Sequence, residues 1–213
     1  MKVISILNPK GGSGKTTIST NLARALQKRG HSVLLVDSDP QGSARDWHAC
    51  LDENPVPLVA LDRPTLMKSL SSIGAEHDFV LIDGAAKLED MIAAAIKVSS
   101  FILIPVQPSP YDLWAVSDLV DFIKARQEVT DGTPGAGFII SRAISGTKLG
   151  EEINVALDDY GLGVFQAVVT QRQIYPRTAS EGQTAFEGDN PDAVAEINTL
   201  TDELLSHVDG SET

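Results

Sequence analysis

The chain has one cysteine, no excess of basic residues and no long hydrophobic run, and each absence excludes a class of protein. A single cysteine, Cys50, cannot form an intramolecular disulfide, which fits a reducing compartment. No stretch approaches the roughly 18 consecutive apolar residues of a membrane-spanning helix, and no charged-then-apolar leader with a cleavage site opens the sequence. We therefore expect a soluble cytoplasmic protein with no membrane partner.

Positive charge is scarce throughout the chain. Lys and Arg number 17 against 29 Asp and Glu, which gives a net charge of −12. A strongly basic nucleic-acid-binding domain is thereby excluded, because such domains carry an excess of cations. Contact with DNA would require a local patch, since phosphate binding needs only a few well-placed cations.

Apolar runs alternate regularly with amphipathic segments. We expect strands at 2–7, 33–37, 56–61, 79–83, 101–106, 137–141 and 164–169, and helices at 15–29, 65–73, 88–98, 113–129, 149–160 and 192–208. Near-continuous apolar strands such as 101–106 indicate a sheet that is covered on both faces, which is typical of parallel sheets. The pattern predicts a doubly wound, mostly parallel α/β sheet with helices on both faces, in a single domain spanning residues 1–213.

Between the first expected strand and the first expected helix lies Asn-Pro-Lys-Gly-Gly-Ser-Gly-Lys-Thr-Thr, residues 8–17. Glycines in such a loop allow successive N–H groups to point at an anion, and the following helix N-terminus adds partial positive charge. Lys15 can reach the β- and γ-phosphates, and the Thr16 hydroxyl can bind Mg²⁺. The sequence therefore predicts a nucleotide site. Its binding residues are Lys10, Gly11, Gly12, Ser13, Gly14, Lys15, Thr16 and Thr17.

Two of the expected strands end in acidic residues. Asp37 ends one strand and Asp83 another, and Asp39 follows two residues after Asp37. Because open α/β sheets bind ligands beyond the carboxyl ends of their strands, Asp37 and Asp83 are candidates to hold Mg²⁺, largely through its waters. A single Asp after a strand is also a common turn former or helix cap. We predict a metal site because the phosphate loop and the two strands that end in Asp37 and Asp83 occur in the expected order along the chain.

The phosphate loop has Pro9 where a first glycine is usual, and a second lysine, Lys10. In this deviant Walker A form the sequence resembles the ParA/MinD ATPases, which have the P-loop NTPase fold. The resemblance is greatest to the small plasmid-type, ParF-like partition proteins. It extends to Asp-Gly at 83–84, Pro-Val-x-Pro-Ser-Pro at 105–110 and Thr-Gln-Arg-Gln at 170–173, and spans roughly positions 1 to 187.

The resemblance implies an ATPase that uses ATP and Mg²⁺, hydrolyses slowly on its own and forms a homodimer when ATP is bound. Lys10 would cross to the phosphates of the opposite subunit and Asp39 would orient the attacking water, so that Lys10, Lys15 and Asp39 are the expected catalytic residues. Thr16, Asp37 and Asp83 would serve the metal. The implied partners are nonspecific DNA, which would place the protein on the nucleoid, and a centromere-binding adaptor of the ParB or ParG kind. The implied function is segregation of plasmid or chromosomal DNA.

Three arginines are candidates for further contacts. Arg172 and Arg177 are the only lysine or arginine residues after Lys148, and Arg172 lies in the Thr-Gln-Arg-Gln match, which favours DNA contact. Ion pairs with nearby acids such as Glu181 are the alternative. Lys148 and Arg142 are weaker candidates for DNA contact. Arg142 ends an expected strand at a place where related ATPases have an Asn or Arg near the base, so it is a candidate adenine contact; a structural salt bridge is equally compatible with its position.

Other functions remain open. The same ATPase would also serve to position a different cargo on the nucleoid, such as a protein organelle or a chemotaxis cluster, because the adaptor determines the cargo. A metallocluster-assembly ATPase would need cysteines at its dimer interface, and Cys50 is the only cysteine in the sequence. A binding module without hydrolysis is disfavoured because the candidate site residues are intact, namely Lys15, Thr16, Asp37, Asp39 and Asp83. The last expected helix has no lysine or arginine, which disfavours attachment to anionic lipid.

Overall fold

The computed structural model describes residues 1–64, 66–86, 89–144 and 149–209. Seven strands form one sheet in the order β3-β2-β4-β1-β5-β6-β7, and every neighbouring pair is parallel. The strands are β1 (Lys2–Ile6), β2 (Val33–Asp37), β3 (Leu58–Ala60), β4 (Phe79–Asp83), β5 (Phe101–Val106), β6 (Gly135–Ala143) and β7 (Gly163–Thr170). The predicted parallel α/β sheet is confirmed. That residues 1–213 form a single domain stays a prediction.

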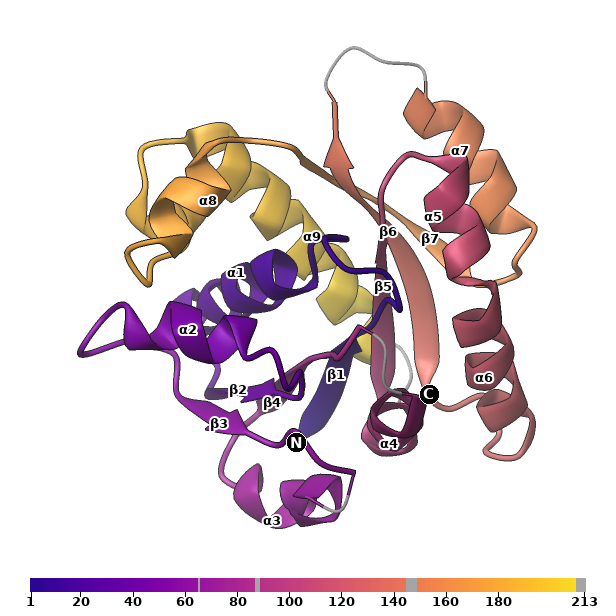
Figure 1. Cartoon of the computed structure of the whole chain (residues 1–213), viewed down its shortest axis with the longest axis horizontal. Coiled ribbons are helices and arrows are strands. Elements are labelled where there is room, and N and C mark those ends of the chain that lie inside the picture. The colour runs from indigo at the N-terminus through magenta and orange to yellow at the C-terminus, as the bar shows by residue number, and fades with distance from the viewer. Residues whose placement is uncertain (65, 87–88, 145–148, 210–213) are drawn as a thin grey trace.

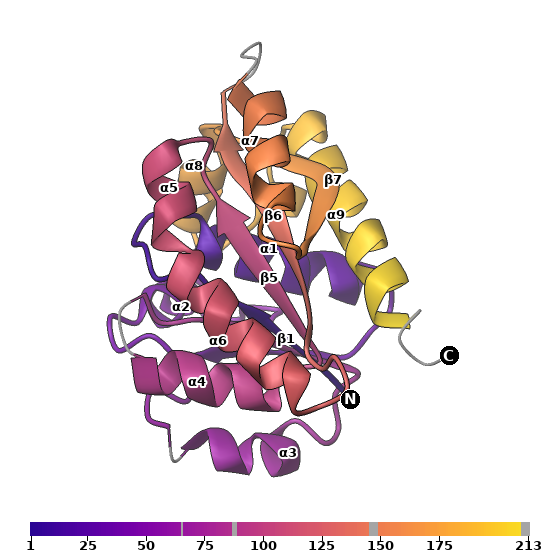
Figure 2. The same cartoon turned by 90° about the vertical axis from the view of Figure 1, so that its right-hand side faces the viewer.

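Helices cover the sheet in two layers, which Figure 1 and Figure 2 show from two sides. One layer holds α1 (Lys15–Lys28), α2 (Ser43–Ala49), α8 (Ile174–Ala179), the 3₁₀ turn η2 (Ala185–Glu187) and α9 (Pro191–Asp209). The other holds η1 (Leu66–Ser69), α3 (Leu70–Ile73), α4 (Glu89–Val98), α5 (Pro110–Ala115), α6 (Ser117–Glu128) and α7 (Leu149–Asp158). The residues expected as one helix at 113–129 belong to two helices, α5 and α6, and neither α2 nor α8 was among the expected helices.

Burial on both faces explains why the strands are almost continuously apolar. Successive side chains of a strand point to opposite faces of the sheet. Ile4 and Ile6 of β1 accordingly pack with α1 and α9, whereas Val3 belongs to the cluster beneath α3 and α4. Among the described residues, no helix is both long and apolar enough to cross a membrane.

The outer edge of β7 is covered by acidic side chains of α9. The Glu203 carboxylate accepts hydrogen bonds from the backbone N–H groups of Gln166 and Ala167, at 2.8 and 2.9 Å. Glu196 does the same for Thr170, at 3.2 Å. Unpaired N–H groups at a sheet edge are a template for association with another strand, so these carboxylates protect the edge.

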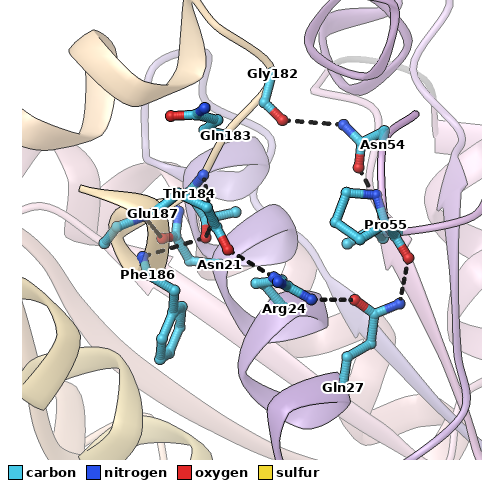
Figure 3. Close-up of polar contacts among 12 residues, drawn as sticks. Asn21, Arg24, Gln27, Asn54, Pro55, Gly182, Gln183, Thr184, Phe186 and Glu187 are labelled. Carbon is cyan, nitrogen blue, oxygen red and sulfur yellow. Dashed lines mark hydrogen bonds and ion pairs between the residues drawn. The ribbon is translucent and has the colours of Figure 1, made fainter. Parts of the chain in front are cut away.

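The segment that follows α8 is tied to α1 by the polar network in Figure 3. Asn21 of α1 accepts a hydrogen bond from the N–H of Ala185 at 2.9 Å, and Arg24 forms an ion pair with Glu187 at 2.8 Å. Asn54 donates to the carbonyl oxygen of Gly182 at 3.0 Å. These contacts fasten the segment 182–187, which follows α8, to α1 and to the loop that contains Asn54.

Candidate nucleotide-binding site

A cavity of about 790 Å³ lies at the carboxyl ends of the strands. Its walls come from five parts of the chain: the loop between β1 and α1 with the start of α1, the residues after β2, Ala86 after β4, the end of β6, and the segment 169–179 that includes α8. This is the edge at which open parallel sheets bind their ligands. The sequence-predicted residues that line the cavity are Gly11, Gly12, Gly14, Lys15, Thr16, Thr17, Asp39, Arg142 and Arg172.

The loop between β1 and α1 has a conformation that depends on glycine. Gly14 is the residue before the first turn of α1 and has φ +97°, where a side chain is strained. A Cβ at Gly14 would also lie 2.4 Å from the Ser141 hydroxyl oxygen. The Asn8 side chain holds the other end of the loop by donating to the Pro105 carbonyl oxygen at 2.7 Å and accepting from the Lys10 N–H at 2.7 Å. Asn8 was not predicted as a site residue.

Lys15 and Ser13 fit a phosphate group. The Lys15 ammonium donates to the backbone carbonyl oxygens of Asn8 and Lys10, at 3.0 and 3.1 Å, so it is held inside the loop. Burial lowers the pKa of Lys15, and the negative charges of Asp83 and Asp39 act in the opposite direction. The Ser13 hydroxyl is buried and has no hydrogen-bond partner in the part of the chain that the structure describes. A buried cation and an unpaired buried hydroxyl in one loop are suited to an anionic ligand.

Thr16 and Asp83, two of the predicted metal residues, are in contact. The Thr16 hydroxyl donates to Asp83 Oδ2 at 2.7 Å, and Ser19 donates to Oδ1 at 3.2 Å. Burial raises the pKa of Asp83 to about 7, although the hydrogen bonds from Thr16 and Ser19 act to lower it. No group of three or more His, Cys, Asp or Glu among the described residues is arranged to hold a metal ion by itself. These oxygens fit Mg²⁺ bound jointly with a phosphate, because Mg²⁺ uses few protein ligands in such sites.

Asp37 lies beside Asp83 in the sheet but serves the loop that follows β2. The two residues are register partners of β2 and β4. Asp37 Oδ1 accepts from the Asp39 N–H at 3.0 Å, and Oδ2 accepts from the Arg45 N–H at 2.9 Å and lies 3.3 Å from Arg45 Nε. Burial raises the pKa of Asp37, against the lowering effect of these bonds. The half-buried Asp39 lines the cavity, and its Oδ1 accepts from the Gln41 N–H at 2.9 Å.

Lys10 forms an ion pair within its own subunit. Its ammonium lies 2.6 Å from Oδ2 of Asp112, the third residue of α5. Asp112 is buried, and its other carboxylate oxygen has no hydrogen-bond partner among the described residues. Sequence reasoning missed Asp112, although it lies two residues after the proline-rich segment that the family resemblance had singled out.

Arg142 contacts the phosphate loop. It has φ +56°, a left-handed conformation that is rare for a residue with a side chain and often marks a functional site. Its Nη1 donates to the Gly12 carbonyl oxygen at 2.9 Å, and Gln107 donates to the same oxygen at 2.8 Å. The predicted adenine contact of Arg142 stays a prediction.

The two arginines predicted to contact DNA both form ion pairs. Arg172 Nη2 lies 2.7 Å from Glu196 of α9, and a second contact of 3.5 Å joins Nη1 to Asp192. Arg177 pairs with Asp189. The alternative interpretation as ion pairs therefore describes both side chains, with acids other than Glu181. DNA contact by Arg172 and Arg177 stays a prediction, and Lys148, a further candidate, lies outside the described residues.

Known proteins share this sequence pattern and fold. Residues 4–185 match the family model "CobQ/CobB/MinD/ParA nucleotide binding domain". "Maintenance of carboxysome distribution protein A" of Halothiobacillus neapolitanus is 31% identical over 208 residues, covering 95% of each chain. "Chromosome-partitioning ATPase Soj" of Thermus thermophilus is 27% identical over 239 residues, covering 96% of each. An ATP complex of McdA from Cyanothece has a TM-score of 0.80 at 17% identity, covering 96% of each chain, which shows a common fold.

The family match spans most of the chain and includes the loop that carries Lys10 and Lys15. The chain belongs to the CobQ/CobB/MinD/ParA nucleotide-binding domain family and is an ATPase of the ParA/MinD type.

Proposed function

We propose that the chain is an ATP-driven positioning switch, which forms a dimer with ATP and Mg²⁺ and returns to monomers after hydrolysis. The observation that carries this proposal is the arrangement of Lys15 and Thr16 at the cavity, in a chain that matches a carboxysome-distribution protein over 95% of both lengths. Both residues line the cavity; Lys15 donates to the Lys10 carbonyl oxygen and Thr16 donates to Asp83. Lys10 is the additional lysine of the deviant Walker A loop, and it is our candidate for the residue that contacts the phosphates of a second subunit.

Each residue has a defined task in the proposed reaction. The N–H groups of residues 11–17 and the Lys15 ammonium bind the phosphates, and Thr16 and Asp83 hold Mg²⁺ with help from Asp37. When bound, Mg²⁺ neutralises charge that develops on the phosphate oxygens. Asp39 accepts a hydrogen bond from the attacking water and orients it. Lys10 leaves Asp112 and reaches the phosphates of the partner subunit, where a cation supplied in trans is worth roughly 10³–10⁵ in rate for some NTPases.

We propose that the cargo is a protein assembly rather than a plasmid. Two relatives that match along nearly their whole length, at 31% and 30% identity, are named for carboxysome distribution. The nucleoid would be the track and a separate adaptor would connect cargo to ATPase. The chain's own sequence does not specify the cargo, because no described part of it lies outside the ATPase fold.

DNA segregation is the second candidate. The Soj relative is named for chromosome partitioning, and the chain shares the proline-rich and Thr-Gln-Arg-Gln segments of the plasmid-type proteins it resembles. The adaptor would then be a centromere-binding protein.

Light scattering on the purified protein tests the switch. We expect a doubled mass with ATP and Mg²⁺, and a monomer with ADP. Lys10→Ala should bind ATP and remain a monomer, and Asp39→Ala should form a dimer that hydrolyses ATP at no more than a hundredth of the normal rate. A monomer in every nucleotide state would refute the proposal.

Deleting the gene in its own cells distinguishes the two cargoes. Clustering of a large protein assembly with unchanged plasmid inheritance supports the positioning function. An increased rate of plasmid or chromosome loss, with protein assemblies evenly spaced, supports DNA segregation instead.

A further inference from the structure

Arg45 of α2 connects the two acidic residues that follow β2. Its backbone N–H and its Nε both face Asp37 Oδ2, at 2.9 and 3.3 Å. Its Nη2 donates to the backbone carbonyl oxygen of Asp39 at 2.8 Å, with a longer contact of 3.3 Å to the carbonyl oxygen of Pro40. One guanidinium therefore joins a fully buried carboxylate to the backbone of the residue proposed to orient water.

Asp62 completes the arrangement from the far side of the guanidinium. Arg45 Nη1 lies 3.2 Å from Asp62 Oδ2, and both side chains are 32% exposed. Leu61 and Asp62 are the first two residues after β3. The Leu61 N–H donates to the Asp37 carbonyl oxygen at 2.9 Å, which places Asp62 near the end of β2. All three guanidinium nitrogens of Arg45 thus have a partner, and the partners come from two segments of the chain, residues 37–40 after β2 and Asp62 after β3.

The turn between Asp39 and α2 is built around this side chain. Gly42 has φ +74°, and a Cβ at that position would lie 3.0 Å from both Nε and Nη2 of Arg45. The Gly42 N–H donates to the same Asp39 carbonyl oxygen at 2.9 Å, and Asp39 N–H is held by Asp37. The backbone of Asp39 is therefore fixed at both its N–H and its carbonyl group.

We propose that Arg45 is a positioning residue for hydrolysis: its guanidinium holds the Asp39 backbone so that the Asp39 carboxylate faces the cavity. Arg45 does not line the cavity and acts through Asp39. The planar fork is essential, because only a guanidinium contacts Asp37, Asp62 and the Asp39 carbonyl group together; a lysine ammonium is a point charge and replaces one of these contacts. The inference rests on the proposed catalytic role of Asp39.

A purely structural role of Arg45 would consist of neutralising the buried Asp37 charge. Kinetic measurements separate this role from the positioning of Asp39. Arg45→Lys keeps a positive charge near Asp37, and Arg45→Met keeps only the length of the side chain. Because a displacement of about 1 Å in a reacting group can lower a rate about 100-fold, we expect kcat for ATP to fall at least tenfold in both variants. KM for ATP should stay within about twofold, since the phosphate loop is unchanged. Arg24→Met, which breaks an ion pair of similar exposure away from the cavity, is the matched control.

A double-mutant cycle identifies the route of the effect. In an Asp39→Ala background, Arg45→Lys should cause no further loss of kcat, because the residue through which it acts is already absent. Equal losses in both backgrounds would overturn the proposal. If Asp39→Ala alone hydrolyses ATP at the normal rate, the catalytic assignment of Asp39 fails instead.

Amide hydrogen exchange supplies a readout that needs no nucleotide. Residues 38–42 should exchange at least tenfold faster in Arg45→Lys, and normally in Arg24→Met. Unchanged exchange together with unchanged kcat would refute the proposal. If Arg45→Met does not fold, Arg45→Lys and Asp62→Asn answer the same question, because both leave Asp37 beside a cation.

Discussion

Lys10 has two uses that exclude each other. Within its own subunit it forms a 2.6 Å ion pair with the buried Asp112, whereas the proposed dimer needs the same ammonium at the partner's phosphates. Dimer formation therefore includes the breaking of a charge-assisted hydrogen bond. Since the Lys10 side chain is 39% exposed, solvent offsets part of that loss.

Asp112→Asn should favour the dimer, because it removes the charge that retains Lys10. We expect the ATP concentration for half-maximal dimer formation to fall by about two- to tenfold, which corresponds to roughly 0.5–1.5 kcal/mol. Light scattering during an ATP titration measures this directly. Asp118→Asn, an exposed carboxylate on the neighbouring helix, is the control and should change nothing. A higher ATP requirement in Asp112→Asn would contradict the idea that Asp112 competes for Lys10.

Glu187 makes stability depend on pH through the network that Figure 3 shows. Burial acts to raise the pKa of Glu187, but hydrogen bonds from Thr184 and Arg24 keep the pKa below its usual value. A carboxyl group with a lowered folded-state pKa stabilises the fold above its unfolded pKa, near 4.5, and loses that contribution as pH falls through the folded pKa.

Replacing Glu187 by Gln keeps the shape and the capping contact but removes the charge. We expect the free energy of unfolding to fall by about 0.5–1 kcal/mol at pH 7. The difference from the unmodified protein should vanish once the pH falls below the lowered folded-state pKa of Glu187. Urea unfolding at a series of pH values measures it. A difference that persists at low pH would indicate that the charge is not the cause.

The site residues that could be predicted from the sequence are those that belong to a short, recognisable stretch of it. Thr16 and Lys15 belong to a contiguous motif, and Asp83 ends an apolar run. Arg45 and Asp112 have no such signature, because their roles arise from contacts between separate segments: Asp112 meets Lys10 across 102 positions of sequence. Residue type alone could not identify them.

The elements were more predictable, since all seven strands are strongly apolar. The failures concern helices whose boundaries depend on tertiary packing. The α5–α6 junction occurs at the buried Val116, where the sequence has neither proline nor glycine. Helix α8 has only six residues and contains Pro176 in its first turn, where proline is tolerated, so it gives little helical periodicity.

Helix α9 should determine how well the β7 edge is protected. Glu203→Ala removes the acceptor for two strand N–H groups, and we expect the free energy of unfolding to fall by about 1–2 kcal/mol. Hydrogen exchange at Gln166 and Ala167 should become faster than in Thr199→Ala, a control on the same helix whose hydroxyl donates to the Ala195 carbonyl oxygen. Equal exchange in the two variants would show that solvent satisfies these groups equally well.

For the whole molecule, a net charge of −12 opposes contact with DNA. DNA binding should therefore require ATP, because the proposed dimer presents two cation patches together. The affinity for DNA should fall steeply as the salt concentration rises. We expect Arg172→Glu to weaken binding at least tenfold in a filter-binding assay, and Arg126→Glu on α6 to leave it unchanged. If Arg172→Glu binds DNA as tightly as the unmodified protein, the DNA contact lies elsewhere. That result would mean that the ion pair with Glu196 already neutralises Arg172.

The strand order also governs how the chain matures during synthesis. β1 is made first, yet its only strand neighbours are β4 and β5, which begin at residues 79 and 101. The cavity wall extends to residue 179, so a growing chain has no complete nucleotide site until most of its length has left the ribosome. An apolar strand thus remains unpaired through the early part of translation, a stage at which exposed apolar strands are prone to aggregate.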